Sequence, residues 1–358
     1  MNIVKPESIA VFCLTPGGVA LAQQLQTYLP LTCYCSQKLL VPGFVPFNGT
    51  FAQTVAQAFG EFSALIVIGA TGLTVRVIAP LLKDKTLDPA VVVIDERGQH
   101  VISLLSGHVG GANALTRYLA GVLKADPVIT TATDVNALAA LDMLAVQLDA
   151  DMLEMRSGVK QVNQMLVSGQ PVGLFWDHGS LPEPGAVWPV AQCDTRGFVP
   201  VDSLDRLPDG LAALVCVSLR HRLPVLPLPV YKLVPRRVVV GIGCRRATSF
   251  QLLIGLLQQQ LAKYELDPLA LKAIGSISLK ADEPALHHLS ACCRVPFNVY
   301  SVSELQQHEH LFPASEFVRQ TTGVGVVSQP VAWLMSKGHL VGDTLKEQGV
   351  TITLGVTH

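Results

Sequence analysis

The sequence predicts a multi-domain α/β protein, and three observations lead to that fold class. The chain has 358 residues, more than one ordinary hydrophobic core accommodates. Hydrophobic residues make up 49% and charged residues 15%, as in globular proteins with large cores. Short apolar runs, such as residues 64–70 and 238–242, alternate with helical periodicity, which is typical of a mostly parallel sheet covered by helices on both faces.

Residues 1–134 form the expected first domain, which contains a doubly wound and mostly parallel sheet. Its runs of β-branched residues have the length of strands, and the stretches between them carry apolar residues at helical spacing. The expected strands are residues 9–14, 64–69, 91–95, 100–105 and 128–131. The expected helices are residues 19–29, 51–59, 74–82 and 113–123. Turns that contain glycines and hydroxyls connect strands to helices, and Thr74 is an expected N-cap.

The rest of the chain divides into a middle α/β region, a linker and a C-terminal α/β domain. The middle region, residues 135–222, has expected helices at 137–148 and 158–168 and expected strands at 171–176 and 215–219. Residues 223–235 are expected to be an extended linker, because prolines at its start cannot donate to a strand ladder. In the C-terminal domain, residues 236–358, the expected strands are 238–243, 273–278, 296–300 and 350–354, and the expected helices are 250–264 and 284–291.

Charge and composition exclude several classes of partner. The net charge is −1 and no basic stripe is visible, which argues against nucleic acid. The mean hydropathy is +0.41, yet no apolar run approaches the roughly 20 residues that span a bilayer. The N-terminal residues lack a secretory signal, so we expect a cytoplasmic protein. The eight cysteines lack zinc-ribbon spacing and are expected to be structural thiols.

The turn Ser106-Gly-His-Val-Gly-Gly111 is the most informative local feature. It follows an apolar strand and precedes a helix, so a helix N-terminus with free N–H groups lies beside it. Three glycines in five residues allow close approach of a ligand, or positive φ without strain. Imidazole can accept and return a proton near pH 7, so His108 is a candidate catalytic base. The alternative is a histidine that is packed in a tight turn.

Two other strand-to-helix turns carry arginines. Arg76 follows Gly69-Ala-Thr-Gly72, and Arg245 and Arg246 follow Gly243-Cys244. A cation near a helix N-terminus opposes the helix dipole, so we expect each arginine to pair with an anion. For Arg76 that anion could equally be a nearby side chain such as Asp95. For the arginine pair, recognition of a carboxylate or phosphate is favoured.

Other common sites are not supported by the motifs. Gly241-Ile-Gly243 lacks the third glycine and the distant acidic residue of a dinucleotide fingerprint, which leaves a nucleotide-dependent oxidoreductase or transferase as a remote alternative. The chain has no Walker A sequence and no Gly-x-Ser-x-Gly nucleophile elbow. The histidine pairs at 287–288 and 308–310 do not supply three convergent ligands, so no metal site is predicted.

Several long motifs, in order along the chain, resemble the CbiG family, the cobalt-precorrin-5A hydrolases of anaerobic cobalamin biosynthesis. They include Gly69-Ala-Thr-Gly72, the sequence around Ser106-Gly-His-Val-Gly-Gly111, and Thr130-Thr-Ala-Thr-Asp134. In the last third, the resemblance rests on Val239-Val-Gly-Ile-Gly-Cys-Arg-Arg246, Leu279-Lys-Ala-Asp-Glu-Pro284 and Gly323-Val-Gly325. One departure is Ala247, where the family usually has glycine. A methyl group fits there unless φ is positive.

The resemblance implies that water opens a δ-lactone in the substrate and that a two-carbon unit leaves as acetaldehyde, giving cobalt-precorrin-5B. His108, with Ser106 beside it, is then the expected catalytic pair, and the Gly110 and Gly111 N–H groups are expected to bind the oxyanion. Ser106, Asp95 and Glu96 are alternative bases. The expected substrate-binding residues are Gly69, Thr71, Gly72, Arg76, Gly107, Asn113, Gly243, Cys244, Arg245 and Arg246.

No cofactor is expected beyond the cobalt that the substrate carries. The expected partner is the cobalt-corrinoid substrate, a small-molecule polycarboxylate that suits local clusters of arginine in a nearly neutral protein. A homodimer and contacts with neighbouring pathway enzymes are further partners that the sequence leaves open. The competing interpretation is a non-catalytic carrier that binds corrinoid intermediates and passes them on.

Overall fold

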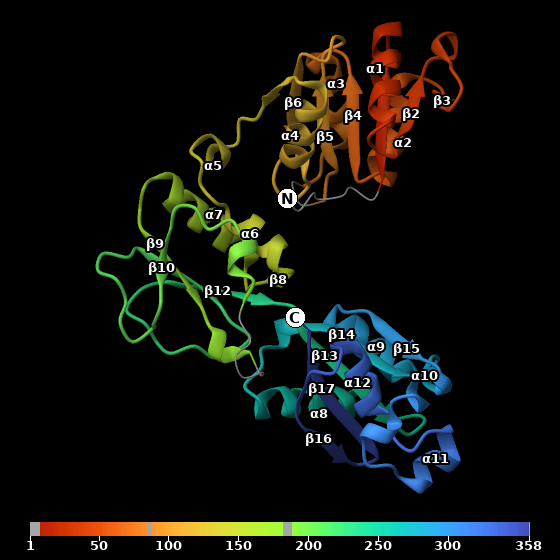
Figure 1. Ribbon diagram of the computed structural model, residues 1–358, viewed down its shortest axis with the longest axis vertical. Coiled ribbons are helices and arrows are strands. Elements are labelled where there is room, and N and C mark those ends of the chain that lie inside the picture. The colour runs from red at the N-terminus through yellow and green to blue at the C-terminus, as the bar shows by residue number, and fades with distance from the viewer. Residues whose placement is uncertain (1–7, 85–86, 182–187, 358) are drawn as a thin grey trace. The chain divides into compact units, whose positions relative to one another are not determined.

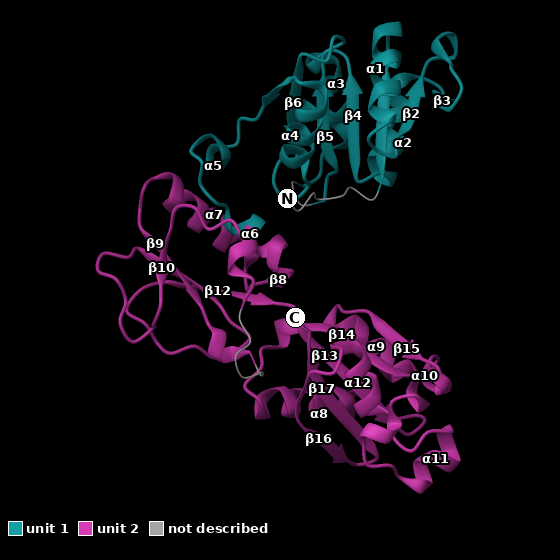
Figure 2. Cartoon of the chain, in the orientation of Figure 1, with its two compact units in different colours: residues 1–143 teal, residues 144–358 magenta. Residues whose placement is uncertain are grey.

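The computed structural model describes residues 8–84, 87–181 and 188–357 (Figure 1). The N-terminal residues 1–7, on which the absence of a secretory signal was argued, lie outside this part. The chain forms two compact units, residues 1–143 and 144–358 (Figure 2). Three sheets occur among the described residues, each combined with helices, so the predicted multi-domain α/β class is confirmed. No helix in the described ranges has the length and apolar character needed to cross a membrane.

The first unit is built on a seven-stranded sheet with the order β3-β2-β1-β4-β5-β6-β7. Its strands are β1 (Ile9–Cys13), β2 (Thr32–Cys35), β3 (Phe44–Pro46), β4 (Ala64–Ile68), β5 (Ala90–Ile94), β6 (His100–Leu105) and β7 (Asp126–Val128). Strands β1 to β5 are parallel to one another. Strand β6 is antiparallel to β5, and β7 is parallel to β6. The sheet is therefore mostly parallel, as predicted.

Helices cover both faces of this sheet (Figure 1). They are α1 (Pro16–Gln26), α2 (Phe51–Glu61), α3 (Thr71–Ile78) and α4 (Ala112–Leu123). Apolar residues of α1 and α4 pack on one face, and those of α2 and α3 pack on the other. Because β1, β4 and β5 are buried on both faces, they need uninterrupted runs of apolar residues, which is why the sequence predicted them.

The reversal at β6 decides where the turns of the first unit lie. Leu105, at the end of β6, pairs with Val91 near the start of β5. The turn after β6 therefore lies at the edge of the sheet where β4 and β5 begin, whereas the turn at Gly69, after β4, lies at the opposite edge. Strands of this length hold the two edges about 17 Å apart.

The middle region contains a five-stranded sheet with the order β10-β9-β11-β12-β8. Its strands are β8 (Ala150–Asp151), β9 (Val172–Trp176), β10 (Phe198–Val201), β11 (Ala213–Val217) and β12 (Val230–Pro235). Helices α5 (Ala132–Val135), α6 (Leu141–Leu148) and α7 (Met155–Val167) precede or flank it. Residues 230–235 were predicted as linker but form β12, which pairs in parallel with β11. The earlier prolines of the segment precede the strand and Pro235 ends it, so none interrupts the pairing of residues 230–233 with β11.

The C-terminal part contains a five-stranded sheet with the order β15-β14-β13-β17-β16. Its strands are β13 (Val238–Cys244), β14 (Leu271–Ile277), β15 (Phe297–Tyr300), β16 (Leu340–Glu347) and β17 (Val350–Val356). Its helices are α8 (Phe250–Lys263), α9 (Pro284–Cys293), α10 (Val302–Gln306), α11 (Glu316–Thr322) and α12 (Ser328–Ser336). Strands β13, β14 and β15 are parallel, so the turn after Cys244 lies at their carboxyl edge.

Candidate active site

The turn between β6 and α4 is packed around its own glycines. A Cβ atom at Gly107 would lie 2.7 Å from Oδ1 of Asn113, and one at Gly110 would lie 2.4 Å from Cβ of Ser106. Gly111 has a φ of 88°, which favours glycine. Of the two explanations for the glycines, positive φ therefore accounts for Gly111. Close packing inside the turn, and not the approach of a ligand, accounts for the other two.

Ser106 holds the turn to the sheet. Its hydroxyl donates to the backbone oxygen of Asp88 at 2.9 Å, and its own φ is 55°. The prediction that Ser106 supports the imidazole of His108 is not met, because this hydroxyl is bound to the backbone ahead of β5.

Most backbone N–H groups at the start of α4 donate hydrogen bonds within the turn that precedes the helix. The N–H of Gly111 donates to the oxygen of His108 at 2.9 Å, and the N–H of Ala112 donates to the oxygen of Ser106 at 3.1 Å. Gly111 therefore cannot supply the predicted oxyanion contact without breaking the turn. The N–H of Gly110 has no hydrogen-bond partner within the described ranges, and it remains a candidate donor.

Two carboxylates flank the imidazole of His108. Its Nδ1 lies 3.1 Å from Oδ2 of Asp142, and its Nε2 lies 3.2 Å from Oδ2 of Asp134. The hydroxyl of Thr133 also lies 3.1 Å from Nε2. Because all three ionisable side chains are 15–19% exposed, a small molecule can reach the edge of this cluster. We call His108, Asp134 and Asp142 the histidine–carboxylate cluster.

This geometry makes His108 a cation at neutral pH. Hydrogen bonds to Asp134 and Asp142 raise the pKa of His108 from 6.5 to about 9, although burial opposes the shift. The same contact, with Arg117, lowers the pKa of Asp134 to about 2 against the effect of burial. A protonated imidazole has no lone pair, so in this state His108 does not accept the proton of the water as predicted. A carboxylate of the cluster is the better acceptor.

Asn113 joins the elements that carry the cluster. Its amide nitrogen donates to the hydroxyl of Thr131 at 2.9 Å and to Oδ2 of Asp134 at 2.8 Å. Its oxygen accepts from the hydroxyl of Ser103 at 2.6 Å. The guanidinium of Arg117, one helical turn later, pairs with the other oxygen of Asp134. Asn113 is 4% exposed, so its contacts support a positioning role and not the predicted contact with substrate.

The turn from Gly69 to Arg76 lies at the other edge of this sheet and does not meet the cluster. Helix α3 begins at Thr71 and not at Thr74, so Arg76 lies in the last turn and not in the first. The argument that Arg76 opposes the helix dipole is therefore wrong. Arg76 is exposed, and it makes no ion pair with any residue that the structure describes.

The alternative bases Asp95 and Glu96 also lie at that other edge, because they follow β5. Burial opposes ionisation of Asp95, but the backbone N–H groups of His100 and Arg97 outweigh it and lower the pKa of the carboxyl. Asp95 thus closes the turn between β5 and β6 and does not bind Arg76. Glu96 lies against Gly17, where a Cβ would approach its Oε1 to 2.7 Å.

In the C-terminal part, the turn after β13 presents two exposed arginines. Arg245 and Arg246 stand between Cys244 and the N-cap Ser249, whose hydroxyl accepts from the N–H of Leu252. Neither arginine has an ion-pair partner among the residues described here. The side chain of Arg245 lies on Gly349 of the β16–β17 turn, where a Cβ would come within 2.8 Å of Nε. Burial raises the pKa of the Cys244 thiol, so this residue is not an activated nucleophile.

Ala247 is the strained residue of this turn. Its φ is 58°, the condition under which a methyl group is unfavourable. Its N–H donates to Oε1 of Glu283 at 3.0 Å, and the other oxygen of Glu283 pairs with Nζ of Lys280 at 3.2 Å. Both charged residues are buried, and they lie in Leu279-Lys-Ala-Asp-Glu-Pro284, one of the motifs on which the family resemblance rests. Gly243 packs on Thr351, where a Cβ would lie 2.6 Å from the hydroxyl oxygen.

Sequence reasoning missed Asp142 and gave no role to Thr133 or Asp134. The sequence did hold a signal for Thr133 and Asp134, because they follow β7, which is parallel to β6 and adjacent to it. The turn after β7 therefore lies at the same edge of the sheet as the turn after β6, which carries His108. Asp142 carried no such signal, since it lies on a separate helix.

For metals, no group of three or more potential ligands with suitable geometry occurs among the described residues. The rings of His288 and His308 pack on Phe250 and Trp333.

Comparison with known proteins places the whole chain. Family models described as cobalamin synthesis G N-terminal, cobalamin biosynthesis central region and cobalamin synthesis G C-terminus match residues 53–134, 139–230 and 238–355. A protein of Salmonella typhimurium named cobalt-precorrin-5A hydrolase is 66% identical over all of both chains. The chain belongs to the cobalamin synthesis G family. The resemblance found in the sequence motifs is thus confirmed.

Other relatives span nearly the same length. A protein of Priestia megaterium named cobalt-precorrin-5A hydrolase is 31% identical over 99% of this chain and 96% of its own. A solved structure of a cobalamin biosynthesis protein G homologue from Sulfolobus solfataricus is 19% identical. It covers 98% of this chain and 97% of its own, with a TM-score of 0.38.

Proposed function

We propose that this protein opens the δ-lactone of cobalt-precorrin-5A with water and releases a two-carbon unit as acetaldehyde, giving cobalt-precorrin-5B. The observation that carries the proposal is the 66% identity, over the full length of both chains, to a protein named cobalt-precorrin-5A hydrolase. The N-terminal, central and C-terminal family models all match this chain.

The histidine–carboxylate cluster has the charges that the proposed reaction needs. Water attacks the lactone carbonyl, the ring C–O bond breaks, and the resulting alkoxide becomes the aldehyde as its C–C bond breaks. The electron pair of that bond passes into the macrocycle, where a carbon takes up a proton. One water proton must therefore be removed and one proton must be delivered. Asp142 accepts the first, and protonated His108, held between Asp134 and Asp142, supplies the second.

Charge stabilisation in this proposal comes from the same turn. The imidazolium of His108 and the N–H of Gly110, two positions later in this turn and without a hydrogen-bond partner among the described residues, together offer positive charge and a hydrogen-bond donor to the tetrahedral oxyanion. Ser106, Gly107, Gly111 and Asn113 keep this turn in place through the contacts described above. Peripheral carboxylates of the substrate are proposed to bind Arg245 and Arg246, whose guanidinium groups are exposed and suit bidentate recognition. The turn after β4 lies at the opposite edge of the sheet from His108, too far to contact the same lactone. This turn carries Gly69, Thr71, Gly72 and Arg76.

The reaction as written consumes only water, so we propose that it needs no cofactor beyond the cobalt of the substrate. We also propose a cytoplasmic location, which is supported by eight unpaired cysteines, since disulfides are rare in that compartment. The corrinoid is the proposed partner. A homodimer or a complex with neighbouring pathway enzymes would be seen by sedimentation of the purified protein.

Acetaldehyde release tests this function directly. Purified protein is incubated without oxygen with cobalt-precorrin-5A, and acetaldehyde is measured with an NADH-coupled alcohol dehydrogenase. We expect stoichiometric acetaldehyde, with label from heavy-oxygen water in one carboxylate of the product, and no loss of activity after dialysis against a chelator. A carrier would change the spectrum of the corrinoid on binding and release no acetaldehyde, and that result would refute the proposal.

A further inference from the structure

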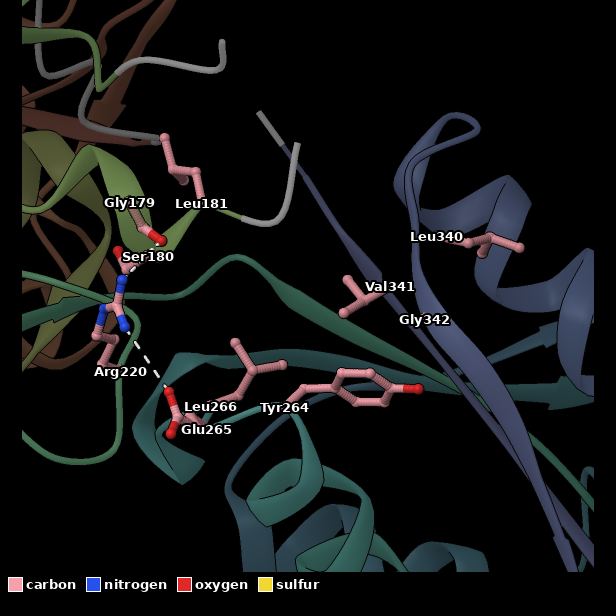
Figure 3. Close-up of a pocket in the computed structure, with 10 residues that line it drawn as sticks. All are labelled: Gly179, Ser180, Leu181, Arg220, Tyr264, Glu265, Leu266, Leu340, Val341 and Gly342. Atoms are coloured by element: carbon pink, nitrogen blue, oxygen red, sulfur yellow. Dashed lines mark hydrogen bonds and ion pairs between the residues drawn. The ribbon is translucent and has the colours of Figure 1, made fainter. Parts of the chain in front are cut away.

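A cavity of about 330 Å³ lies in the second unit, and none of the residues used in the proposed mechanism lines it (Figure 3). One wall comes from the middle region, where Gly179, Ser180 and Leu181 follow β9 and Arg220 follows β11. The opposite wall comes from the C-terminal part, with residues 264–266 after α8 and residues 340–342 at the start of β16.

The position of this cavity in the middle sheet is one that favours ligand binding. Strands β9 and β11 are adjacent and parallel, and the cavity lies outside their carboxyl ends. The chain leaves β9 toward β10 on one side and leaves β11 toward β12 on the other. Ligands of open α/β sheets bind at such a reversal of strand order.

The backbone of Arg220 is fixed from several directions. Its N–H donates to the hydroxyl of Ser218 at 3.0 Å, and its oxygen accepts from Nζ of Lys232 at 3.0 Å. It also forms a β-bridge with Leu266 of the opposite wall. The base of the side chain is therefore held in place before any ligand arrives, which reduces the entropy lost on binding.

The guanidinium of Arg220 is held on one side and loosely paired on the other. Its Nε donates to Oδ2 of the buried Asp177 at 3.0 Å, and one terminal nitrogen donates to the oxygen of Gly179 at 3.0 Å. The remaining nitrogen lies 3.7 Å from Oε2 of Glu265, whose side chain is 75% exposed (Figure 3). This contact is too long for a hydrogen bond, so another carboxylate can replace Glu265 at small cost.

Beside these polar groups, aliphatic and aromatic side chains form part of the cavity lining. Leu181, Leu266, Leu340 and Val341 contribute aliphatic carbons, and Tyr264 contributes its ring. The ring is fixed, because its hydroxyl accepts from the N–H of Asp343 at 2.6 Å and Gly342 lies directly against it. A cavity of this size is at the lower end for small-molecule sites and is too small for a tetrapyrrole macrocycle.

We propose that this cavity binds a carboxylate carried on a short apolar stem, with the carboxylate on Arg220 in place of Glu265. Two sources supply that chemistry: an acetate or propionate arm of the corrinoid substrate, or a free short-chain carboxylic acid. Only the first source rests on the proposed function.

Binding of butyrate to the full chain tests the site itself. Saturation-transfer NMR should detect butyrate but not butanol, which has the same stem without the charge. The loss of one charge-assisted contact in Arg220→Gln should weaken butyrate binding about tenfold. Glu265→Gln removes the competing carboxylate and should strengthen binding severalfold. If Arg220 and Glu265 serve only to join the two walls of the cavity, butyrate should bind to none of the variants, and that result would overturn the proposal.

The kinetics of acetaldehyde release identify the source. If an arm of the substrate occupies the cavity, KM rises in Arg220→Gln and falls in Glu265→Gln while kcat stays within twofold of the parent. If the ligand is a free acid, KM is unchanged and butyrate binding still follows the two variants. Should Arg220→Gln fail to fold, Glu265→Gln decides alone, because its side chain is exposed. Acetaldehyde release by the parent chain is measured separately, so a failure here leaves the proposed function intact.

Discussion

The Nδ1 atom of His108 lies 3.1 Å from Oδ2 of Asp142, which stands 34 positions later in the chain. This contact ties the turn after β6 to the start of α6, and Asp134 binds the other ring nitrogen from α5. The imidazole is therefore held between two carboxylates and is positively charged at neutral pH. Its proposed role changes from a base to a proton donor and a stabiliser of negative charge.

Replacing His108 tests whether the cluster is catalytic. Glutamine keeps hydrogen-bonding capacity but carries neither the charge nor the transferable proton, so kcat for acetaldehyde release should fall by about 10²–10⁴ in His108→Gln. The matched control is His100→Gln, since His100 also pairs with an aspartate but is 55% exposed at the far end of β6. The control should keep kcat within twofold. Wild-type turnover in His108→Gln would remove the cluster from the mechanism.

The raised pKa of His108 predicts how stability depends on pH. The native state binds the proton more tightly than the unfolded state, so the contribution is complete below pH 6.5 and is lost as pH rises through about 9. The full stabilisation of the folded state by this proton is about 3 kcal/mol. This figure describes the whole contact between His108 and its carboxylates, so the lowered pKa of Asp134 is not added to it.

Urea unfolding of the parent chain and of His108→Gln at a series of pH values measures this contribution. The difference in unfolding free energy between the two should be largest near pH 6 and should shrink toward pH 9.5. A difference that stays constant over this range would mean that His108 does not bind a proton between its carboxylates.

Much of the first unit could be predicted from sequence, because strands buried on both faces require apolar runs that are visible without alignment. The direction of β6 was predictable too, since the short turn at Glu96-Arg97-Gly98 permits only antiparallel pairing with β5. Applying that rule would have moved His108 to the edge opposite Gly69. Short or partly exposed elements, such as β2 (Thr32–Cys35) and β10, gave no comparable pattern and were missed.

The candidate site was less predictable than the fold. The turn at His108 was found because glycine and histidine are conspicuous there, but the reason for two of its glycines is contact with Asn113 and Ser106, which only the folded turn shows. Asp142 reaches His108 through the path of the chain between α5 and α6, and no local pattern encodes that path. Arg220 was missed although it follows an expected strand, because its site depends on the order of β9 and β11 in the middle sheet, which the sequence does not show.

Gly110→Ala tests how closely the turn must pack. The new Cβ would overlap Cβ of Ser106 at 2.4 Å and its oxygen at 2.7 Å, so the turn must distort, at a cost of about 1–3 kcal/mol. Acetaldehyde release should fall with it, because His108 moves. Gly121→Ala is the control: Gly121 lies in α4 with open space at its Cβ position, and alanine should stabilise the helix by about 0.5–1 kcal/mol. Equal unfolding midpoints for the two variants would contradict the packing argument.

Ala247 offers a substitution that should stabilise the protein. Its φ of 58° is unfavourable for a residue with a Cβ, whereas glycine adopts it freely. Ala247→Gly should therefore raise the free energy of unfolding by up to about 1 kcal/mol. Glycine relieves the backbone strain of the folded state, but part of that gain is lost because glycine also increases the conformational entropy of the unfolded chain. Ala281→Gly is the matched control, because Ala281 has a φ of −55° and glycine there should destabilise. Since the Glu283 contact is to the backbone N–H of residue 247, it survives the change, and KM should remain that of the parent. A loss of stability in Ala247→Gly similar to that in Ala281→Gly would show that residue 247 is not held in the left-handed conformation.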